Sequence, residues 1–193
     1  MNVYDFDRTI YDGDSTVDFY LFCLKRHRKI AFVFPSLVVA YIKYYIFKSG
    51  SKTQFKETMY KFLKHCDIDK DLAVFWEIHE KKIKNWYIEQ RKDDDVIISA
   101  SPFFLLEPIG EKTGFRVIAS DVDKHNGKYS GENCYYEEKV NRFIKEYPDS
   151  HIDEFYSDHY SDLPLAKIAN KAYIVSGNEI SDWDFSKKIK PRI

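Results

Sequence analysis

The chain has 193 residues, of which 44% are hydrophobic and 17% aromatic, enough for the core of one folded domain and too many for a disordered chain. The formal net charge is only −1, which argues against a general nucleic-acid-binding protein. Residues 25–92 nevertheless carry 16 Lys and Arg against 7 Asp and Glu, a net of +9 that leaves −10 on the remainder.

The chain opens on a predicted strand, Val3–Phe6, and no signal-peptide pattern comes before it. At the end of this strand the sequence Asp-Phe-Asp-Arg-Thr places two carboxylates, Asp5 and Asp7, two residues apart. On extended backbone these side chains point the same way, so one can attack while the other transfers protons. The alternative is a polar strand end without catalytic chemistry.

Residues 13–95 are predicted to be mainly helical, with little strand pattern and all of the basic excess. Within them, residues 30–47 are apolar enough to suggest a membrane span. A single crossing would, however, separate Asp5 from the candidate site residues after position 95. Two interpretations stay open: a helix buried against its neighbours, or a helix lying on an anionic membrane surface, with residues 25–56 making the contact.

A second strand is predicted at Val96–Ile98, and it runs into Ser99-Ala100-Ser101-Pro102. A hydroxyl at Ser99 and the backbone N–H of Ala100 can together hold a phosphate oxygen. The alternative is a plain junction between a strand and a turn. A third strand follows at Phe115–Ala119, and Asn126-Gly127 predicts a hairpin at the edge of the sheet.

Lys139 lies at the start of a predicted helix, Glu138–Tyr147. A lysine there can offset the negative charge of a phosphate and of a carboxylate nucleophile, although a solvated surface lysine is the plainer interpretation. A fourth strand, Ile152–Tyr156, leads into two further carboxylates, Asp158 and Asp162. Such a pair suits a hard cation such as Mg²⁺, and the alternative is an acidic loop with a helix N-cap.

The last predicted elements are a helix at Leu165–Asn170 and a strand at Ala172–Val175. Strands that alternate with helices predict an α/β fold with a mainly parallel sheet covered on both faces. The helical block interrupts this pattern. We therefore predict an α/β core formed by residues 1–12 and 96–193, with residues 13–95 inserted as a helical cap.

The three cysteines, Cys23, Cys66 and Cys134, are far apart in sequence, odd in number and form no Cys-x-x-Cys pair. They predict reduced thiols in a cytoplasmic protein, not a disulfide framework or a zinc site.

The four motifs, in this order, resemble those of the haloacid dehalogenase superfamily of phosphatases, over nearly the whole chain. The resemblance implies a Rossmann-like core with a helical cap and Mg²⁺-dependent hydrolysis of a phosphate monoester through an aspartyl-phosphate. It also implies roles for individual residues: Asp5 as nucleophile, Asp7 as acid and base, Thr9 and Ser99 as phosphate-binding hydroxyls, Lys139 as the charge-balancing lysine, and Asp5, Asp7, Asp158 and Asp162 around the metal.

A helical cap directly after the first motif resembles the phosphoserine phosphatase branch, subfamily IB. Ser-Pro after the second motif and Tyr-Ser-Asp in the fourth resemble the C-type phosphatidylglycerophosphatases. Two residues depart from the pattern: Arg8 stands where glycine is common, and His159 where a small residue is usual. His159 either contacts metal or substrate, or is an ordinary loop residue. Asp14 either contacts the substrate or caps the first helix of the insertion.

Three classes of function follow from these patterns. The first is hydrolysis of a lipid-linked phosphate such as phosphatidylglycerophosphate by an enzyme peripheral to the cytoplasmic membrane. The second is hydrolysis of a soluble phosphorylated metabolite of the phosphoserine type. The third, a non-catalytic protein that binds phosphate or membrane, is the least favoured, because every chemical position is occupied.

Overall fold

The computed structural model describes residues 1–187, with the side chain of Lys52 left out; residues 188–193, at the end of the predicted core, lie outside the described part. Its centre is a six-stranded sheet in the order β3-β2-β1-β4-β5-β6, parallel except for β6. The strands are β1 (Asn2–Tyr4), β2 (Val96–Pro102), β3 (Arg116–Ser120), β4 (Ile152–Ser157), β5 (Ala169–Ser176) and β6 (Glu179–Asp182). This confirms the predicted α/β fold with a mainly parallel sheet.

The strand order reverses at β1, because the chain builds β2 and β3 on one side of it and β4 and β5 on the other. Ligands of open α/β sheets bind outside the carboxyl ends of the strands at such a switch point. β1 ends at Tyr4, so the chain delivers Asp5 to this position. Val96, Ile97 and Ile98 of the neighbouring strand are fully buried, as expected of a parallel strand covered on both faces.

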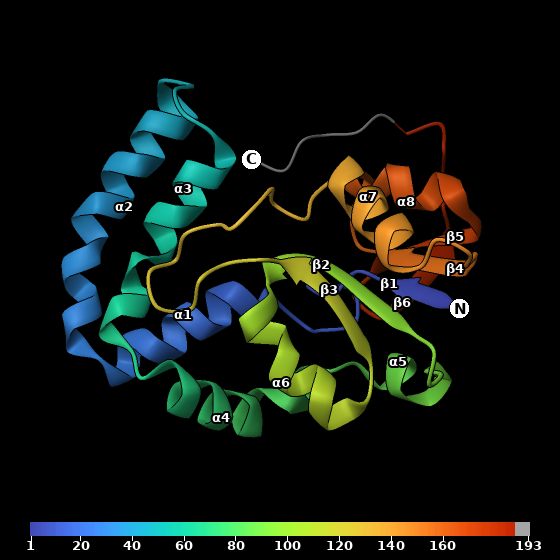
Figure 1. The fold of residues 1–193 in the computed structure, drawn as a ribbon, viewed down its shortest axis with the longest axis horizontal. Coiled ribbons are helices and arrows are strands. Elements are labelled where there is room, and N and C mark those ends of the chain that lie inside the picture. The colour runs from blue at the N-terminus through green and yellow to red at the C-terminus, as the bar shows by residue number, and fades with distance from the viewer. Residues whose placement is uncertain (188–193) are drawn as a thin grey trace.

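Helices cover the two faces of the sheet separately (Figure 1). One face carries α4 (Ile68–His79), α5 (Asn85–Gln90) and α6 (Phe103–Thr113), and the other carries α7 (Glu137–Glu146) and α8 (Leu163–Ile168). The alternation of side chains along β1 divides the core in the same way. Tyr4 packs in the cluster that contains Trp76 and Leu105, whereas Val3 packs in the cluster that contains Phe143 and Leu165.

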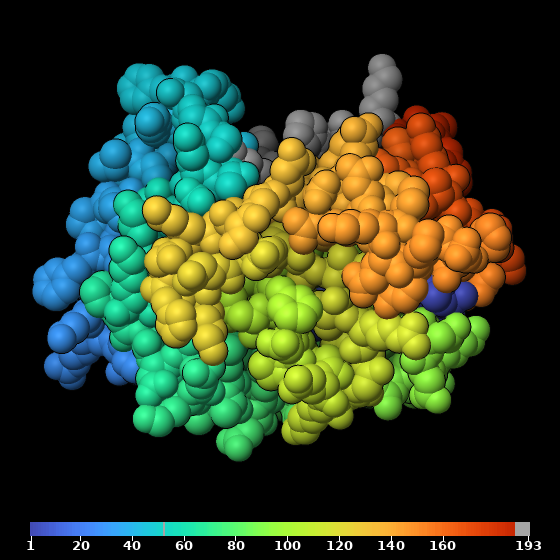
Figure 2. All heavy atoms as spheres, in the orientation of Figure 1, coloured from blue at the N-terminus to red at the C-terminus, as the bar shows by residue number. Residues whose placement is uncertain are grey.

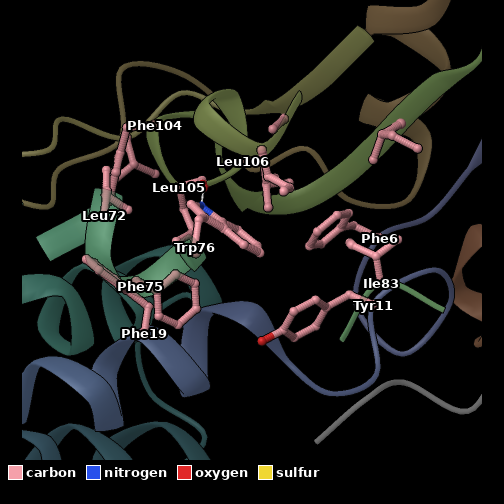
Figure 3. Close-up of a cluster of buried hydrophobic side chains, with 14 of the residues drawn as sticks. Phe6, Tyr11, Phe19, Leu72, Phe75, Trp76, Ile83, Phe104, Leu105 and Leu106 are labelled. Carbon is pink, nitrogen blue, oxygen red and sulfur yellow. Dashed lines mark hydrogen bonds between the residues drawn. The ribbon is translucent and has the colours of Figure 1, made fainter. Parts of the chain in front are cut away.

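Between β1 and β2 the described chain forms only helices, which we call the helical insertion (residues 15–90). It contains α1 (Ser15–Arg26), η1 (Arg28–Val33), α2 (Phe34–Tyr41), η2 (Ile42–Ile46), α3 (Lys52–Met59), η3 (Tyr60–His65), α4, η4 (Glu80–Lys82) and α5. Its second half packs directly on the core. The indole of Trp76 donates to the Leu105 carbonyl of α6 at 2.7 Å (Figure 3), and Tyr87 packs edge-on against Tyr4 of β1. The predicted boundary of a separate cap at residues 13–95 stays a prediction.

The first half of the insertion projects from the rest of the molecule as a pair of neighbouring segments, α2 with η2 and α3, which we call the α2–α3 hairpin (Figures 1 and 2). The helical run Arg28–Ile46 is long and apolar enough to span a membrane by length and composition, yet only 11% of its most apolar window is buried. Phe32, Val39 and Phe47 are 82%, 65% and 73% exposed. The interpretation that this segment is buried against its neighbours is therefore wrong.

Three details differ from the sequence-based expectation. β6 was not predicted, because its residues are all exposed and lack an apolar pattern. The hairpin at Asn126-Gly127 does pair Val122 with Tyr129, but it lies outside the sheet and contacts η3 of the insertion through Tyr60. The last helix begins two residues earlier than predicted and ends at Ile168, because β5 starts at the next residue.

The contact between this turn and the insertion gives a testable prediction. Gly127 has φ +73°, and a Cβ there would lie 2.5 Å from the Cβ of Tyr60; Gly177 has φ +62° and no neighbour within 4 Å. Gly127→Ala should therefore lower the free energy of unfolding by about 1–3 kcal/mol for the clash, beyond the cost of the backbone strain. Gly177→Ala is the control, because it introduces the backbone strain of a positive φ but no steric clash. Equal losses in urea denaturation would show that the turn does not pack on Tyr60.

Candidate functional site

Asp5 lies at the end of β1, and hydrogen bonds with β4, with α7 and with its own loop hold it there. Its backbone N–H donates to the Tyr156 carbonyl at 2.8 Å, which continues the pairing of β1 with β4. The side chain is only 9% exposed. One carboxylate oxygen accepts a bond from Lys139 Nζ at 2.7 Å, and the other accepts one from Thr9 Oγ1 at 3.3 Å. The nucleophile candidate is thus fixed in orientation by two donors.

Lys139 is buried between two carboxylates. Its Nζ lies 2.7 Å from Asp5 Oδ1 and 2.8 Å from Asp162 Oδ2, and the latter oxygen also accepts a bond from Ser157 Oγ. Burial opposes the charge on Lys139, but the attraction of Asp162 and Asp5 outweighs it and raises the pKa of the ammonium group. The interpretation of Lys139 as a solvated surface lysine is therefore wrong.

Asp7 is held by donors that the sequence motifs did not include. Its Oδ1 accepts a bond from the Ser15 N–H at 2.6 Å, its Oδ2 accepts one from Ser101 Oγ, and Thr16 Oγ1 lies 3.1 Å from that hydroxyl. Burial, with the nearby charge of Asp14, raises the pKa of Asp7 to about 6, against the opposing effect of the hydrogen bonds. A carboxyl group that titrates near neutrality can both give and take a proton.

Ser99 and Ala100 lie beside these carboxylates at the end of β2. The hydroxyl of Ser99 is buried and accepts a bond from the Ser101 N–H at 3.1 Å. The carbonyl of Ala100 accepts bonds from Ser120 Oγ and from Lys56 Nζ of the insertion, at 3.1 and 3.0 Å. Hydrogen bonds therefore connect the end of β2 to both the core and the insertion. The contact of Ser99 and Ala100 with a phosphate oxygen stays a prediction.

The fourth motif is joined to the first through Thr9. The hydroxyl of Thr9, which donates to Asp5, accepts a bond from the Asp158 N–H at 2.9 Å. His159 accepts a bond from the Ser161 N–H on its Nδ1 at 3.0 Å and thereby caps η5 (Tyr160–Asp162). This contact favours a structural role in the loop for His159.

The oxygen donors at the ends of β1 and β4 fit a magnesium ion by their chemistry. The Asp5 and Asp158 carboxylates and the Asp7 carbonyl belong to adjacent strand ends that Thr9 links, and hard oxygen ligands are those that Mg²⁺ prefers. Asp162 instead contacts Lys139 and Ser157. Its predicted place around the metal therefore stays a prediction.

Asp14 and Arg8 lie at the rim. Asp14 Oδ1 accepts a bond from the Val17 N–H at 3.1 Å and so caps α1, which is one of its two predicted roles. Its Oδ2 lies 3.9 Å from the guanidinium of Arg8. Arg8 has φ 62°, a backbone conformation that few residues other than glycine adopt, which explains why the position favours glycine.

Most of these residues surround a cavity of about 350 Å³, whose lining does not include Thr9, Asp158 or His159. The floor contains the carboxylates and Lys139, and the opposite wall comes from the helical insertion. The lining residues are Asp5, Asp7, Arg8, Asp14, Thr16, Val17, Tyr45, Phe55, Lys56, Met59, Tyr60, Ser99, Ala100, Ser101, Tyr135, Lys139, Ser161 and Asp162. The site therefore joins acidic, cationic and hydroxyl groups on one side to largely aromatic and apolar groups on the other.

Comparison with known proteins agrees with this geometry. The family profile of the haloacid dehalogenase-like hydrolases matches residues 3–167. No curated protein matches the chain at a significant level.

Several solved structures share the fold. A protein of unknown function from Bordetella pertussis is 18% identical, with a TM-score of 0.68 over 89% of this chain and 87% of its own. A phosphoserine phosphohydrolase-like protein from Francisella tularensis is 15% identical, with a TM-score of 0.53 over 89% and 86%. A hydrolase of the same family from Salmonella enterica serovar Typhi is 11% identical, with a TM-score of 0.58 over 88% and 60%. At these identities the likeness concerns the fold alone.

The buried ion cluster gives a second testable prediction. Lys139→Met leaves two buried carboxylates without their cation and should lower the free energy of unfolding by about 3–5 kcal/mol at neutral pH. Adding Asp162→Asn should restore part of this loss, because it removes one of the two uncompensated charges. Lys145→Met, on the exposed face of the same helix, is the control and should change stability by less than about 0.5 kcal/mol. Strictly additive effects of the two substitutions would contradict the cluster.

Proposed function

The chain belongs to the haloacid dehalogenase-like hydrolases, and on this premise we propose that it hydrolyses phosphate monoesters through an aspartyl-phosphate on Asp5. The observation that carries the proposal is the placement of Asp5, a buried carboxylate held by Lys139 and Thr9 on the floor of a pocket. Asp7 lies in the same pocket with its pKa raised to about 6. A nucleophile and a proton carrier are therefore present together.

In the first step an oxygen of Asp5 attacks phosphorus, the bond to the leaving alcohol breaks, and Asp7 donates a proton to the departing oxygen. In the second step Asp7 takes a proton from water, which attacks the aspartyl-phosphate and releases inorganic phosphate. Lys139 keeps a positive charge beside Asp5 throughout. Mg²⁺ would be held by Asp5, the Asp7 carbonyl and Asp158, with Asp162 direct or through water, and would offset charge on the phosphate oxygens.

A lipid-linked phosphate such as phosphatidylglycerophosphate is the substrate class that the insertion favours, as in the C-type phosphatidylglycerophosphatases. The wall opposite Asp5 presents Tyr45, Phe55 and Met59 to the leaving group. The first of these belongs to η2 and the other two to α3, so the α2–α3 hairpin lines the pocket. Other apolar side chains of the hairpin, such as Val39 and Ile46, are exposed. A cavity of about 350 Å³ admits a phosphorylated head group but leaves acyl chains outside.

The hairpin and the residues just before it also carry the charge that such a surface needs. Residues 25–56 contain eight Lys and Arg and no Asp or Glu. Lys25, Arg28, Lys29, Lys43 and Lys48 are exposed around apolar side chains that are themselves exposed. Apolar side chains flanked by cations suit an anionic membrane surface, to which each cation contributes about 1 kcal/mol. We propose that the protein is peripheral to the cytoplasmic face of a membrane.

A soluble metabolite phosphatase of the phosphoserine type is the second candidate. The observation in its favour is the size of the cavity, because about 350 Å³ suffices for a small phosphomonoester on its own. A non-catalytic binding protein is less well supported, because Asp5, Asp7 and Lys139 all line one pocket.

The proposed nucleophile is tested by Asp5→Asn, which keeps the shape of the side chain but removes its nucleophilic charge. Release of inorganic phosphate should fall by about three orders of magnitude or more, while the circular dichroism spectrum stays unchanged. Asp12→Asn is the matched control, because Asp12 is exposed in the same loop and outside the pocket. Release of inorganic phosphate should be measured with phosphatidylglycerophosphate in mixed micelles and with phosphoserine, each in the presence of Mg²⁺ and of EDTA. Near-normal turnover by Asp5→Asn would refute the assignment, and activity that survives EDTA would refute the role of the metal.

The membrane surface is tested by flotation with vesicles of neutral or anionic lipid at low and high salt. The protein should float with anionic vesicles, less so at high salt, and least when Lys25, Arg28 and Lys29 are changed to Gln. Phe32→Ser with Phe47→Ser should also weaken flotation, whereas Phe185→Ser, which is 56% exposed elsewhere, should not. A protein that stays soluble throughout while hydrolysing phosphoserine would support the second candidate.

A further inference from the structure

A second cluster of chemically reactive side chains lies inside the helical insertion, away from the residues that line the pocket. Cys23 is buried in the last turn of α1, Cys66 follows η3, and Asp71 is buried in α4. One ligand atom of each lies within 4.8 Å of the other two. Their separation in sequence, 43 residues between the two thiols, had concealed this arrangement. We propose that Cys23, Cys66 and Asp71 bind one zinc ion.

The donor set matches the chemistry of zinc. Two thiolates and a carboxylate are ligands that Zn²⁺ accepts, whereas the oxygen-only set around Asp5 suits Mg²⁺. Ligand atoms of a tetrahedral zinc site lie about 3.5 Å apart, so no two ligand atoms, which lie within 4.8 Å of each other, need to approach by more than about 1.3 Å to close around the ion. Cys66 is partly exposed, which gives the ion a way in.

The carboxylate of Asp71 is already oriented by neighbours. Its Oδ1 accepts a bond from Arg26 Nε at 3.0 Å, and its Oδ2 accepts one from the Asp67 N–H at 3.1 Å. Hydrogen bonds of this kind fix a carboxylate that ligates a metal. Two thiolates, Asp71, a zinc ion and the guanidinium of Arg26 together sum to zero charge, which lowers the cost of burying the site.

A histidine lies beside Asp71 and helps to orient its carboxylate, outside the group of three ligand atoms that lie within 4.8 Å of one another. The ring of His27 lies with Nε2 2.6 Å from Asp71 Oδ2, and it follows Cys23 by four residues at the end of the same helix. Cys23 precedes the α2–α3 hairpin in the chain, and Cys66 and Asp71 follow it. The ion would therefore tie the two ends of the hairpin together at its base.

The test is the zinc content of the full chain after incubation with one equivalent of Zn²⁺ and gel filtration. The wild type should retain about one zinc per chain, and Cys23→Ser and Cys66→Ser should lose most of it. Cys134→Ser is the matched control, because this buried cysteine packs in the other hydrophobic cluster, and it should retain the ion. Asp5→Asn should retain it as well, which separates this site from the pocket.

Substitution of Co²⁺ for Zn²⁺ gives a spectroscopic readout of the ligands, in addition to the measured metal content. Co²⁺ bound by thiolates shows a sulfur-to-metal charge-transfer band, which the wild type and Cys134→Ser should display and Cys66→Ala should lack. Cys66 is partly exposed, so this variant should fold. A wild type that binds no zinc, zinc content unchanged in Cys23→Ser, or an intact mass showing a Cys23–Cys66 disulfide in protein that takes up no metal would each overturn the proposal.

Discussion

The charge of Lys139 is the interaction on which the site depends. An ammonium group buried to this extent is stable only beside opposite charges, and Asp5 and Asp162 supply them at 2.7 and 2.8 Å. Asp5 directly follows β1, Lys139 lies in the first turn of α7, and Asp162 ends η5 after β4. The ion cluster therefore fixes these elements relative to one another. The same contacts orient Asp5 in the pocket. Stability and chemistry therefore rest on one set of contacts.

The helical insertion is less separate from this core than its place in the sequence suggests. Trp76 and Tyr87 pack with β1 and α6 in one hydrophobic cluster, and Lys84 donates hydrogen bonds to the carbonyls of Arg8 and Gly177. Half of the insertion thus acts as a layer of the core and holds the loop that follows Asp5. The α2–α3 hairpin and the basic residues just before it, such as Arg28 and Lys29, are the part left to face outward, and they combine exposed apolar side chains with positive charge.

The sequence predicted the sheet because Val96–Ile98 and the other strands are short apolar runs bounded by polar motifs. It also pointed to Asp5, Asp7 and Lys139, because their motifs lie at strand ends or helix starts, which a parallel sheet brings to one edge. It missed the donors to Asp7, since Ser15 is an ordinary helix-start residue and Ser101 carried no role of its own in the run after the second strand. It also missed the approach of Cys23 to Cys66, which depends on long-range packing.

The central claim is that Asp5 becomes phosphorylated during turnover. The direct measurement is acid quenching of the enzyme in mid-turnover, reduction with borohydride, and peptide mass spectrometry. Borohydride converts an aspartyl-phosphate, and not a free carboxylate, to homoserine. The account predicts homoserine at position 5 and at no other aspartate, Asp7 included. Homoserine at another aspartate, or a phosphate adduct on a serine such as Ser99, in protein that releases phosphate would contradict it.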